Sequence, residues 1–498
     1  MCVSGNGKIP RLFFACLVIS KPWRFDIWGC FFKVPYLSWI NDKPIDSCMN
    51  QNKVLFWSIT VALAGFLFGF DTVVISGADE QLQELWHTDD LFHGFVVMSM
   101  ALWGTVIGAI FGSIPTDRLG RKQTLLWIGV LYFASAMGSA LASDPYWFSF
   151  FRFIGGLGVG ASTIAAPAYV SEIAPPDRRG RLVALYQFNI VLGILIAFVS
   201  NYLLKDMGTN AWRWMVGVEA IPAFIYTLMV LLVPKSPRWL MSFKKDAEKA
   251  RDVLKMIYPG QDPEPVLRAI REEEEQTTAK GEGITHPKFR FPLILAFLIA
   301  FFNQLSGINA FLYYAPRIFR EAGLEASSAL LSSIGIGITN LIFTLLGLYL
   351  IDRLGRRILM YIGSFGYILS LSLVAAAFFL GWKGMLVPIF FFLFIASHAI
   401  GQGAVIWVFI SEIFPNHLRA KGQSLGSSTH WVLAALITIF MPMLLSGGTN
   451  PGYVFVFFAF MMFLQLLFVW KVMPETKGVP LEELEKQLIR TKSTLTRK

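Results

Sequence analysis

The stretch Phe302–Pro316, which reads FNQLSGINAFLYYAP, decides how the rest of the chain is interpreted. It lies inside an apolar run that begins near Phe291 and is long enough to cross a bilayer as a helix. Carboxamide and phenol side chains at membrane depth are costly unless they meet something polar. Because Ser306-Gly307 and Ala315-Pro316 interrupt the run, we expect the helix to bend or break where it lines a cavity.

Three polar side chains in this stretch are spaced to share one helix face. Gln304 and Asn309 are five residues apart, and Tyr313 follows four residues later. The spacing predicts a site for an uncharged ligand that bears hydroxyl groups. For any one of these residues the alternative is that its amide only joins two helices.

The composition indicates a membrane protein. Of the 498 residues 55% are hydrophobic and 15% aromatic, and the mean hydropathy is +0.56. The net charge of +10 is spread over short loops between apolar runs, which argues against a nucleic-acid partner. The sequence contains no metal-ligand spacing, Gly-rich phosphate loop or serine nucleophile elbow, so we predict no metal, no cofactor and no enzyme activity.

Apolar stretches and basic loops predict the topology. Each stretch has the length that a tilted membrane helix needs, and we predict an all-α polytopic protein with twelve transmembrane helices. The predicted spans are 54–77, 92–114, 122–142, 147–171, 181–204, 213–233, 291–318, 328–351, 358–380, 384–411, 421–445 and 452–473. Lys and Arg collect in alternate loops, and Asp and Glu in the others, which predicts that both termini are cytoplasmic.

The first 48 residues differ in texture from the rest of the chain. All four cysteines lie here, and the segment has no apolar stretch long enough to span a bilayer. Our hypothesis is that Met49 is the initiator and that residues 1–48 are a mis-annotated extension; the alternative is a disordered cytoplasmic tail.

Two motifs occur once in each half of the chain. Asp117-Arg118-Leu119-Gly120-Arg121 returns as Asp352-Arg353-Leu354-Gly355-Arg356 after 235 residues, and Glu172-Ile173-Ala174-Pro175 returns as Glu412-Ile413-Phe414-Pro415 after 240. Duplication of this kind predicts two six-helix bundles related by pseudo-twofold symmetry. The expected bundles are 49–234 and 291–473, joined by a cytoplasmic linker at 235–290 and followed by a tail at 474–498. Within the linker, 246–258 and 263–278 are predicted to form short amphipathic helices.

From about Asn52 to Val479 the chain resembles the sugar porter family of the major facilitator superfamily, specifically its bacterial proton:sugar symporters. Besides the duplicated motifs, Arg152-Phe153-Ile154-Gly155-Gly156, Pro237-Arg238-Trp239-Leu240 and Pro474-Glu475-Thr476-Lys477-Gly478 support this resemblance. It implies transport of a monosaccharide by alternating access.

The duplicated charges predict a latch at the cytoplasmic face that holds the outward-open state. Exposed ion pairs are individually weak, so a latch must act as a network; the alternative is that the charges only fix the topology. The predicted latch residues are Asp117, Arg118, Arg121, Glu172, Arg179, Asp352, Arg353, Arg356, Glu412 and Arg419.

The resemblance also implies which residues contact the sugar. The matching positions are Gln187, Gln304, Asn309, Tyr313, Asn340 and Trp407, to which we add Asn303, His430 and Trp431 at or beside positions where the family usually has other polar residues. Carboxamides donate and accept as vicinal hydroxyls do, and an indole face stacks on a sugar ring. His430 is either a ligand contact or a satisfied buried histidine.

Asp71 and Arg152 are the predicted coupling residues. A carboxylate inside a membrane helix needs a proton or a cation, and family members with an acid at this position resemble proton symporters. The alternative is a fixed ion pair in a passive sugar or inositol carrier. A non-transporting sugar sensor is disfavoured because only 20 residues follow Gly478. Short loops on the external side and the absence of glycosylation sequons suggest a bacterial inner membrane. We also expect the protein to function as a monomer.

Overall fold

The computed structural model describes residues 51–175, 178–279, 283–415, 418–446 and 450–479. Within these ranges every regular element is helical, which confirms the predicted all-α class. The hypotheses about residues 1–48, and most of the predicted tail, lie outside the described residues.

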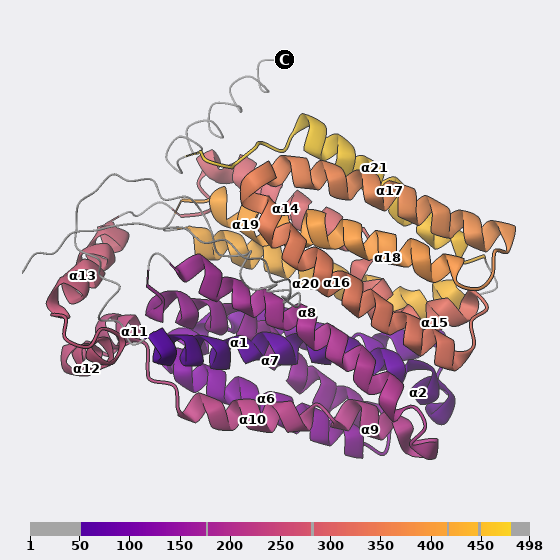
Figure 1. Ribbon diagram of the computed structural model, residues 1–498, viewed down its shortest axis with the longest axis horizontal. Helices are drawn as coiled ribbons and strands as arrows, with labels where there is room; N and C mark the ends of the chain where they lie inside the picture. The colour runs from indigo at the N-terminus through magenta and orange to yellow at the C-terminus, as the bar shows by residue number, and fades with distance from the viewer. Residues whose placement is uncertain (1–50, 176–177, 280–282, 416–417, 447–449, 480–498) are drawn as a thin grey trace, which may run out of the picture. The chain divides into compact units, whose positions relative to one another are not determined.

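The first half of the chain folds into one group of helices, which Figure 1 shows in indigo to magenta. Its elements are α1 (Gln51–Val74), η2 (Ile75–Gly77), α2 (Asp79–Trp86), α3 (Asp90–Phe92), η3 (His93–Met98), α4 (Met100–Phe111), α5 (Ser113–Arg118), α6 (Arg121–Leu141), α7 (Pro145–Ile173), α8 (Arg179–Leu204), α9 (Ala211–Gly217) and α10 (Ala220–Leu231).

The second half forms the other group, drawn in orange to yellow (Figure 1). It packs against the first mainly through α8 with α16 and through α4 with α20. Its elements are α14 (Arg290–Gln304), α15 (Ile308–Glu321), α16 (Ala326–Leu354), α17 (Arg356–Leu380), α18 (Leu386–His398), η6 (Ala399–Gly403), α19 (Ala404–Glu412), α20 (Arg419–Ser446) and α21 (Gly452–Lys471).

Eleven helices in the described ranges are long and apolar enough to span a membrane, and a bent pair brings the number to twelve. The bent pair is the predicted span 92–114, which divides at Ser99 into Asp90–Met98 and Met100–Phe111 with a 40° bend. Six residues before the bend form a π-helix, and the Ser99 hydroxyl donates to the Phe95 carbonyl at 2.8 Å. The predicted span is therefore present but bent, because π-turns and serine back-bonding bend helices.

Both predicted interruptions of the stretch Phe302–Pro316 are confirmed. Gly307 has φ +85° at the start of α15, and a Cβ there would lie 2.8 Å from the Phe458 ring. One residue before Ala315, Tyr314 leaves helical geometry at φ −120°, ψ 17°. The polar residues between these two points therefore lie on a short helix with a break at each end.

The linker contains three helices: α11 (Pro237–Ser242), α12 (Ala247–Ile257) and α13 (Glu264–Ala279). The last two match the predicted helices. In α12, Val253, Leu254 and Ile257 are buried, as an amphipathic helix requires; in α13, Leu267 is buried and its neighbour Val266 is 38% exposed. In α13 the side chain of Leu267 therefore faces the core and that of Val266 does not.

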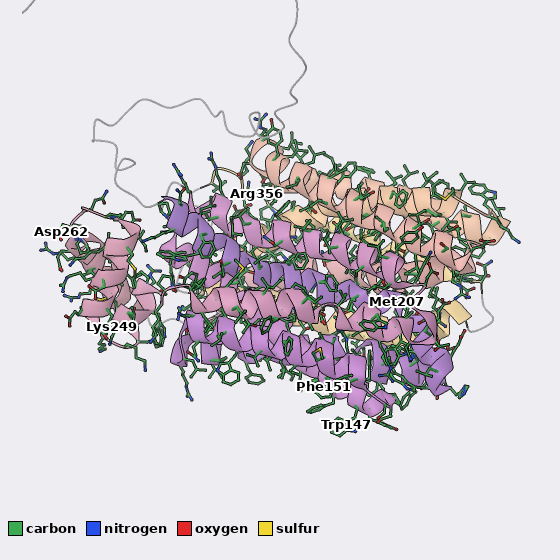
Figure 2. The ribbon with its side chains drawn as sticks, turned by 60° about the horizontal axis from the view of Figure 1, so that its bottom comes forward. Trp147, Phe151, Met207, Lys249, Asp262 and Arg356 are labelled. Carbon is green, nitrogen blue, oxygen red and sulfur yellow. The ribbon has the colours of Figure 1, made fainter. Side chains whose placement is uncertain are left out.

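Two ends of the bundle are distinguished by charge. The end that carries Arg121, Arg356 and the linker is called the basic face, and the end that carries α2 and the loop at Asp206 is called the acidic face. In Figure 2, Lys249 and Asp262 of the linker region lie at one end of the bundle, and Met207 lies toward the other.

Close helix packing in the first half depends on small residues. A Cβ on Gly156 of α7 would lie 1.9 Å from the Ala101 carbonyl oxygen of α4, and one on Gly160 would lie 2.4 Å from the Thr105 carbonyl oxygen. The backbones of α4 and α7 therefore approach so closely that only glycine fits at these positions. Small residues at helix contacts are common in membrane proteins for this reason.

We therefore expect Gly156→Ala to lower stability by about 1–3 kcal/mol, because the added methyl group forces α4 and α7 apart. The matched control is Gly180→Ala, since a Cβ there meets nothing within 4 Å. Thermal unfolding of the purified protein in detergent measures both. Equal Tm values for the two variants would contradict this account of the packing.

Candidate functional site

A buried cluster of amides lies at the break between α14 and α15. The Asn309 amide donates to the Gln304 side-chain oxygen at 2.8 Å, and the Gln304 amide donates to the Asn303 side-chain oxygen at 3.0 Å. All three side chains are at most 7% exposed. Gln304 also reaches a ring nitrogen of His430 on α20 at 3.0 Å. The cluster thus joins α14, α15 and α20 by uncharged hydrogen-bonding groups.

Aromatic rings border the amides. The rings of Trp407 and His430 are 5.4 Å apart, and those of His430 and Trp431 are 4.6 Å apart. Trp431 packs edge-on against Phe68 of α1 at 5.6 Å. Rings from both halves therefore meet beside the amide cluster. His430 is partly exposed and already has a protein partner, so both sequence-based interpretations of it remain open.

Other predicted sugar contacts lie apart from this cluster. Gln187 on α8 is partly buried and Asn340 on α16 is buried, and these two helices pack against each other. Thr344 donates to Asn340 at 3.3 Å, and the described contacts join neither Gln187 nor Asn340 to Gln304. Tyr313 is also buried, but it interacts electrostatically with Arg152 and Asp71.

Asp71 and Arg152 form a buried ion pair between α1 and α7. The guanidinium donates to the Asp71 carboxylate and, at 3.0 Å, to its backbone carbonyl, and both side chains are 1–2% exposed. The structure thus brings together the two residues expected to act in coupling.

A second acid, Glu219, joins this pair and was missed from the sequence. It lies between α9 and α10, is 1% exposed, and interacts electrostatically with both Asp71 and Arg152. One guanidinium therefore faces two carboxyl groups. The signal for it was present, because a lone glutamate inside the apolar run 213–233 is unusual.

The duplicated basic-face motifs adopt the same geometry in each half. Arg121 binds Glu172 at 2.9 Å and Asp117 at 3.1 Å; Arg356 binds Glu412 at 2.7 Å and Asp352 at 3.1 Å. These pairs lie within a half, not between halves. The other predicted latch residues that have described contacts behave likewise: Arg353 covers the Tyr349 ring, and Arg419 donates to the Ser411 carbonyl. Arg118 and Arg179 are exposed.

Glu475 caps this motif in the second half, a role that the sequence did not reveal. It accepts from the backbone N–H groups of Arg356 and Arg357 at 2.9 Å, and Thr476 donates to Glu412 at 2.6 Å. Burial opposes ionisation of Glu475, but the backbone donors, including Lys477, outweigh it and hold its pKa below the ordinary value.

The three-residue charge cluster predicts unequal costs of mutation. Arg152→Gln leaves two buried carboxyl groups without a cation and should lower stability by about 3–5 kcal/mol. Asp71→Asn leaves Glu219 as counter-ion for Arg152 and should cost about 1 kcal/mol. Thermal unfolding in detergent compares the variants; if Asp71→Asn is as damaging as Arg152→Gln, Glu219 is not a counter-ion.

Comparison with known proteins places this geometry in a family. The profile of the family described as "Sugar (and other) transporter" matches residues 57–488. The chain is 33% identical over 458 residues to the arabinose-proton symporter of Bacillus subtilis, covering 90% of this chain and 97% of that protein. It is 32% identical over 473 residues to the D-xylose-proton symporter of Escherichia coli K12, covering 88% and 96%.

Solved structures agree. The chain superimposes on a partially occluded inward-open conformation of the E. coli xylose transporter XylE with a TM-score of 0.77 at 30% identity, covering 86% of this chain and all of that chain. For the same major facilitator superfamily symporter bound to 6-bromo-6-deoxy-D-glucose the TM-score is 0.73 at 31% identity, covering 88% and 100%. The chain therefore belongs to the sugar transporter family of the major facilitator superfamily.

Proposed function

We propose that this protein imports a monosaccharide, a hexose or a pentose, together with a proton by alternating access. The observation that carries the proposal is the buried cluster of Asp71, Glu219 and Arg152, close to Tyr313 on the helix that also holds the uncharged amides. We further propose that it works as a monomer in a bacterial inner membrane, with the basic face and both termini in the cytoplasm.

The amide cluster supports a neutral, polyhydroxylated substrate. Gln304 and Asn309 offer donors and acceptors but no charge, and Trp407 and Trp431 supply ring faces. The relatives named for arabinose and xylose support the same substrate class. We assign Asn303 and His430 to the same site, and Gln187 and Asn340 to its opposite wall, across the contact of α8 with α16.

The charge balance of the cluster supports proton coupling. With both carboxyl groups ionised the cluster carries a net charge of −1 in a low-dielectric interior, which is costly. A proton shared between Asp71 and Glu219 makes it neutral. We propose that this proton enters from the acidic face and leaves toward the basic face, and that its presence decides how firmly Arg152 is held.

The basic-face pairs support the proposed latch. Arg121 and Arg356 are already oriented by acids of their own halves, so their motifs are rigid units that can approach each other. In the proposed mechanism they meet across the halves when the basic face closes, and they separate when it opens.

A passive uniporter is the second candidate, since the Asp71–Arg152 pair has the burial and hydrogen bonds of a structural ion pair. The two candidates differ in one property: a symporter concentrates sugar at the expense of a proton gradient, and a uniporter only equilibrates it.

Uptake of labelled glucose, xylose, galactose, arabinose and myo-inositol into energised vesicles, with and without a protonophore, tests the proposal. We expect accumulation that collapses with the proton gradient. Asp71→Asn should lose accumulation by about tenfold or more while exchanging sugar across the membrane, because the proton-binding group is gone. The control is Asp206→Asn, an acid 86% exposed in a loop.

If Asp71→Asn still concentrates sugar against its gradient, coupling by Asp71 is wrong. If the wild-type protein only equilibrates sugar, and the protonophore has no effect, the uniporter is correct.

A further inference from the structure

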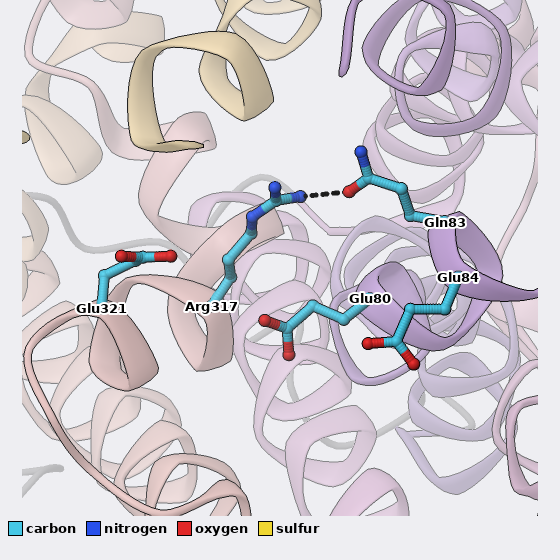
Figure 3. Close-up of a pocket in the computed structure, with 5 residues that line it drawn as sticks. All are labelled: Glu80, Gln83, Glu84, Arg317 and Glu321. Carbon is cyan, nitrogen blue, oxygen red and sulfur yellow. Dashed lines mark hydrogen bonds between the residues drawn. The ribbon is translucent and has the colours of Figure 1, made fainter. Parts of the chain in front are cut away.

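A second charged network lies where the two halves meet at the acidic face. Arg317 of α15 donates to the Gln83 side-chain oxygen of α2 at 2.8 Å and lies 3.7 Å from the carboxylates of Asp79 and Asp90. The Arg317 side chain is only 8% exposed. Arg317 and Gln83 border a pocket of about 250 Å³. Figure 3 shows Arg317 reaching across to Gln83, with Glu321 on the same side as Arg317 and Glu80 and Glu84 opposite.

The acids that face Arg317 are themselves held in place. Asp79 is 2% exposed and binds the His93 ring at 2.8 Å, while its other oxygen is turned to Arg317 and has no hydrogen bond among the described atoms. Gln83 also donates to Asp90 at 2.8 Å. The Arg317 guanidinium of the second half thus lies among the side-chain oxygens of Asp79, Gln83 and Asp90 of the first half, an arrangement that suits a cation.

Here the backbones of the two halves also touch. A Cβ on Gly94 of η3 would lie 2.1 Å from the Ile439 carbonyl oxygen of α20. α15 packs against η2 and α2, and α20 packs against α3 and η3. The acidic face is therefore closed in this conformation, and Arg317 bridges the closed contact.

We propose that Arg317, between Asp79 and Asp90, is an ionic lock that holds the acidic face closed and must be broken before sugar enters from that side. The inference rests on the proposed alternating-access function. It adds a second device at the opposite end of the molecule from the duplicated basic-face motifs.

A neighbouring pair, Arg320 with Glu80, serves as the comparison. Its side chains are 44% and 29% exposed, and exposed pairs contribute little. Burial raises the pKa of Glu80 above its ordinary value despite the opposing Arg320, so acid conditions weaken this pair as the pH falls through that raised pKa. The better buried Arg317 is thus the residue on which closure depends.

One helix face connects this lock with the sites already described. Asn309, Tyr313 and Arg317 succeed each other at intervals of four residues along α15. In order, Asn309 hydrogen-bonds within the amide cluster, Tyr313 interacts electrostatically with the Asp71–Arg152 pair, and Arg317, beyond the kink at Tyr314, lies 3.7 Å from Asp79. A displacement of α15 therefore moves all three sites together.

Distance measurement by double electron–electron resonance tests the lock directly. In the full chain, with the four native cysteines replaced by serine, spin labels are placed at Gln81→Cys and Ser327→Cys, two exposed, uncharged positions on opposite halves at the acidic face. Spectra are recorded without sugar and without a proton gradient, so failure of the proposed transport function does not affect the result.

Arg317→Gln should raise the ratio of the open, long-distance population to the closed one by about tenfold or more, because it leaves Asp79 and Asp90 without their cation. The control, Arg320→Gln, should change that ratio by less than about threefold. Asp90→Asn, at a partly exposed position, should shift the ratio in the same direction as Arg317→Gln and provides a second variant if Arg317→Gln does not fold.

Unchanged distance distributions in folded Arg317→Gln or Asp90→Asn, or equal shifts in Arg317→Gln and Arg320→Gln, would overturn the lock. A purely structural role for Arg317 predicts a broadened distribution with no defined long-distance population.

Discussion

The structure depends on one electrostatic constraint: a single guanidinium, Arg152, faces two carboxyl groups inside the membrane. Neither acid is solvated, and both interact with the same cation. A buried site of this composition is stable only if its charges balance, which requires a cation for each ionised acid or a proton on one of them. The proposed coupling mechanism is a consequence of that requirement, since a site that must gain or lose a proton to stay neutral is already a proton-binding site.

α15 converts this local constraint into a property of the whole molecule. The helix is short because Gly307 begins it at positive φ, and Tyr314 leaves helical geometry before Pro316. A short helix with a break at each end can move without unfolding its neighbours. Asn309 and Tyr313 lie on this short helix, and Arg317 follows directly after the break at Tyr314. A movement of the helix therefore displaces the amide cluster, the side chain nearest the charge cluster and the proposed lock together.

Much of this arrangement was predictable from the sequence. Apolar length predicted the spans, the duplicated motifs predicted two bundles, and the glycine and proline positions predicted both breaks in the seventh span. These features are local, so each can be recognised without knowing what it contacts. The bend at Ser99 lies inside a predicted span, and apolar length alone does not show whether a span is straight.

The residues missed in the sites have a common cause. Glu219, Arg317 and Asp79 belong to no recognisable motif in the sequence, and their roles depend on partners that are distant along the chain or on the other half of the molecule. In the sequence, Arg317 looks like a charge that only fixes the topology at a helix end. Its role becomes visible when the structure shows Asp79 and Gln83 beside it. Which side chains meet across the two bundles depends on how the helices pack, and the periodicity of hydrophobic residues in the sequence does not show this.

The most direct test of the central claim is to count protons during transport. Addition of a transported sugar to de-energised, weakly buffered proteoliposomes containing the wild-type protein should raise the external pH, with roughly one proton taken up per sugar molecule, because the proposed mechanism moves one proton with each sugar. Sugar entry at a normal rate with no change in external pH would contradict the claim and leave Arg152 with a purely structural role.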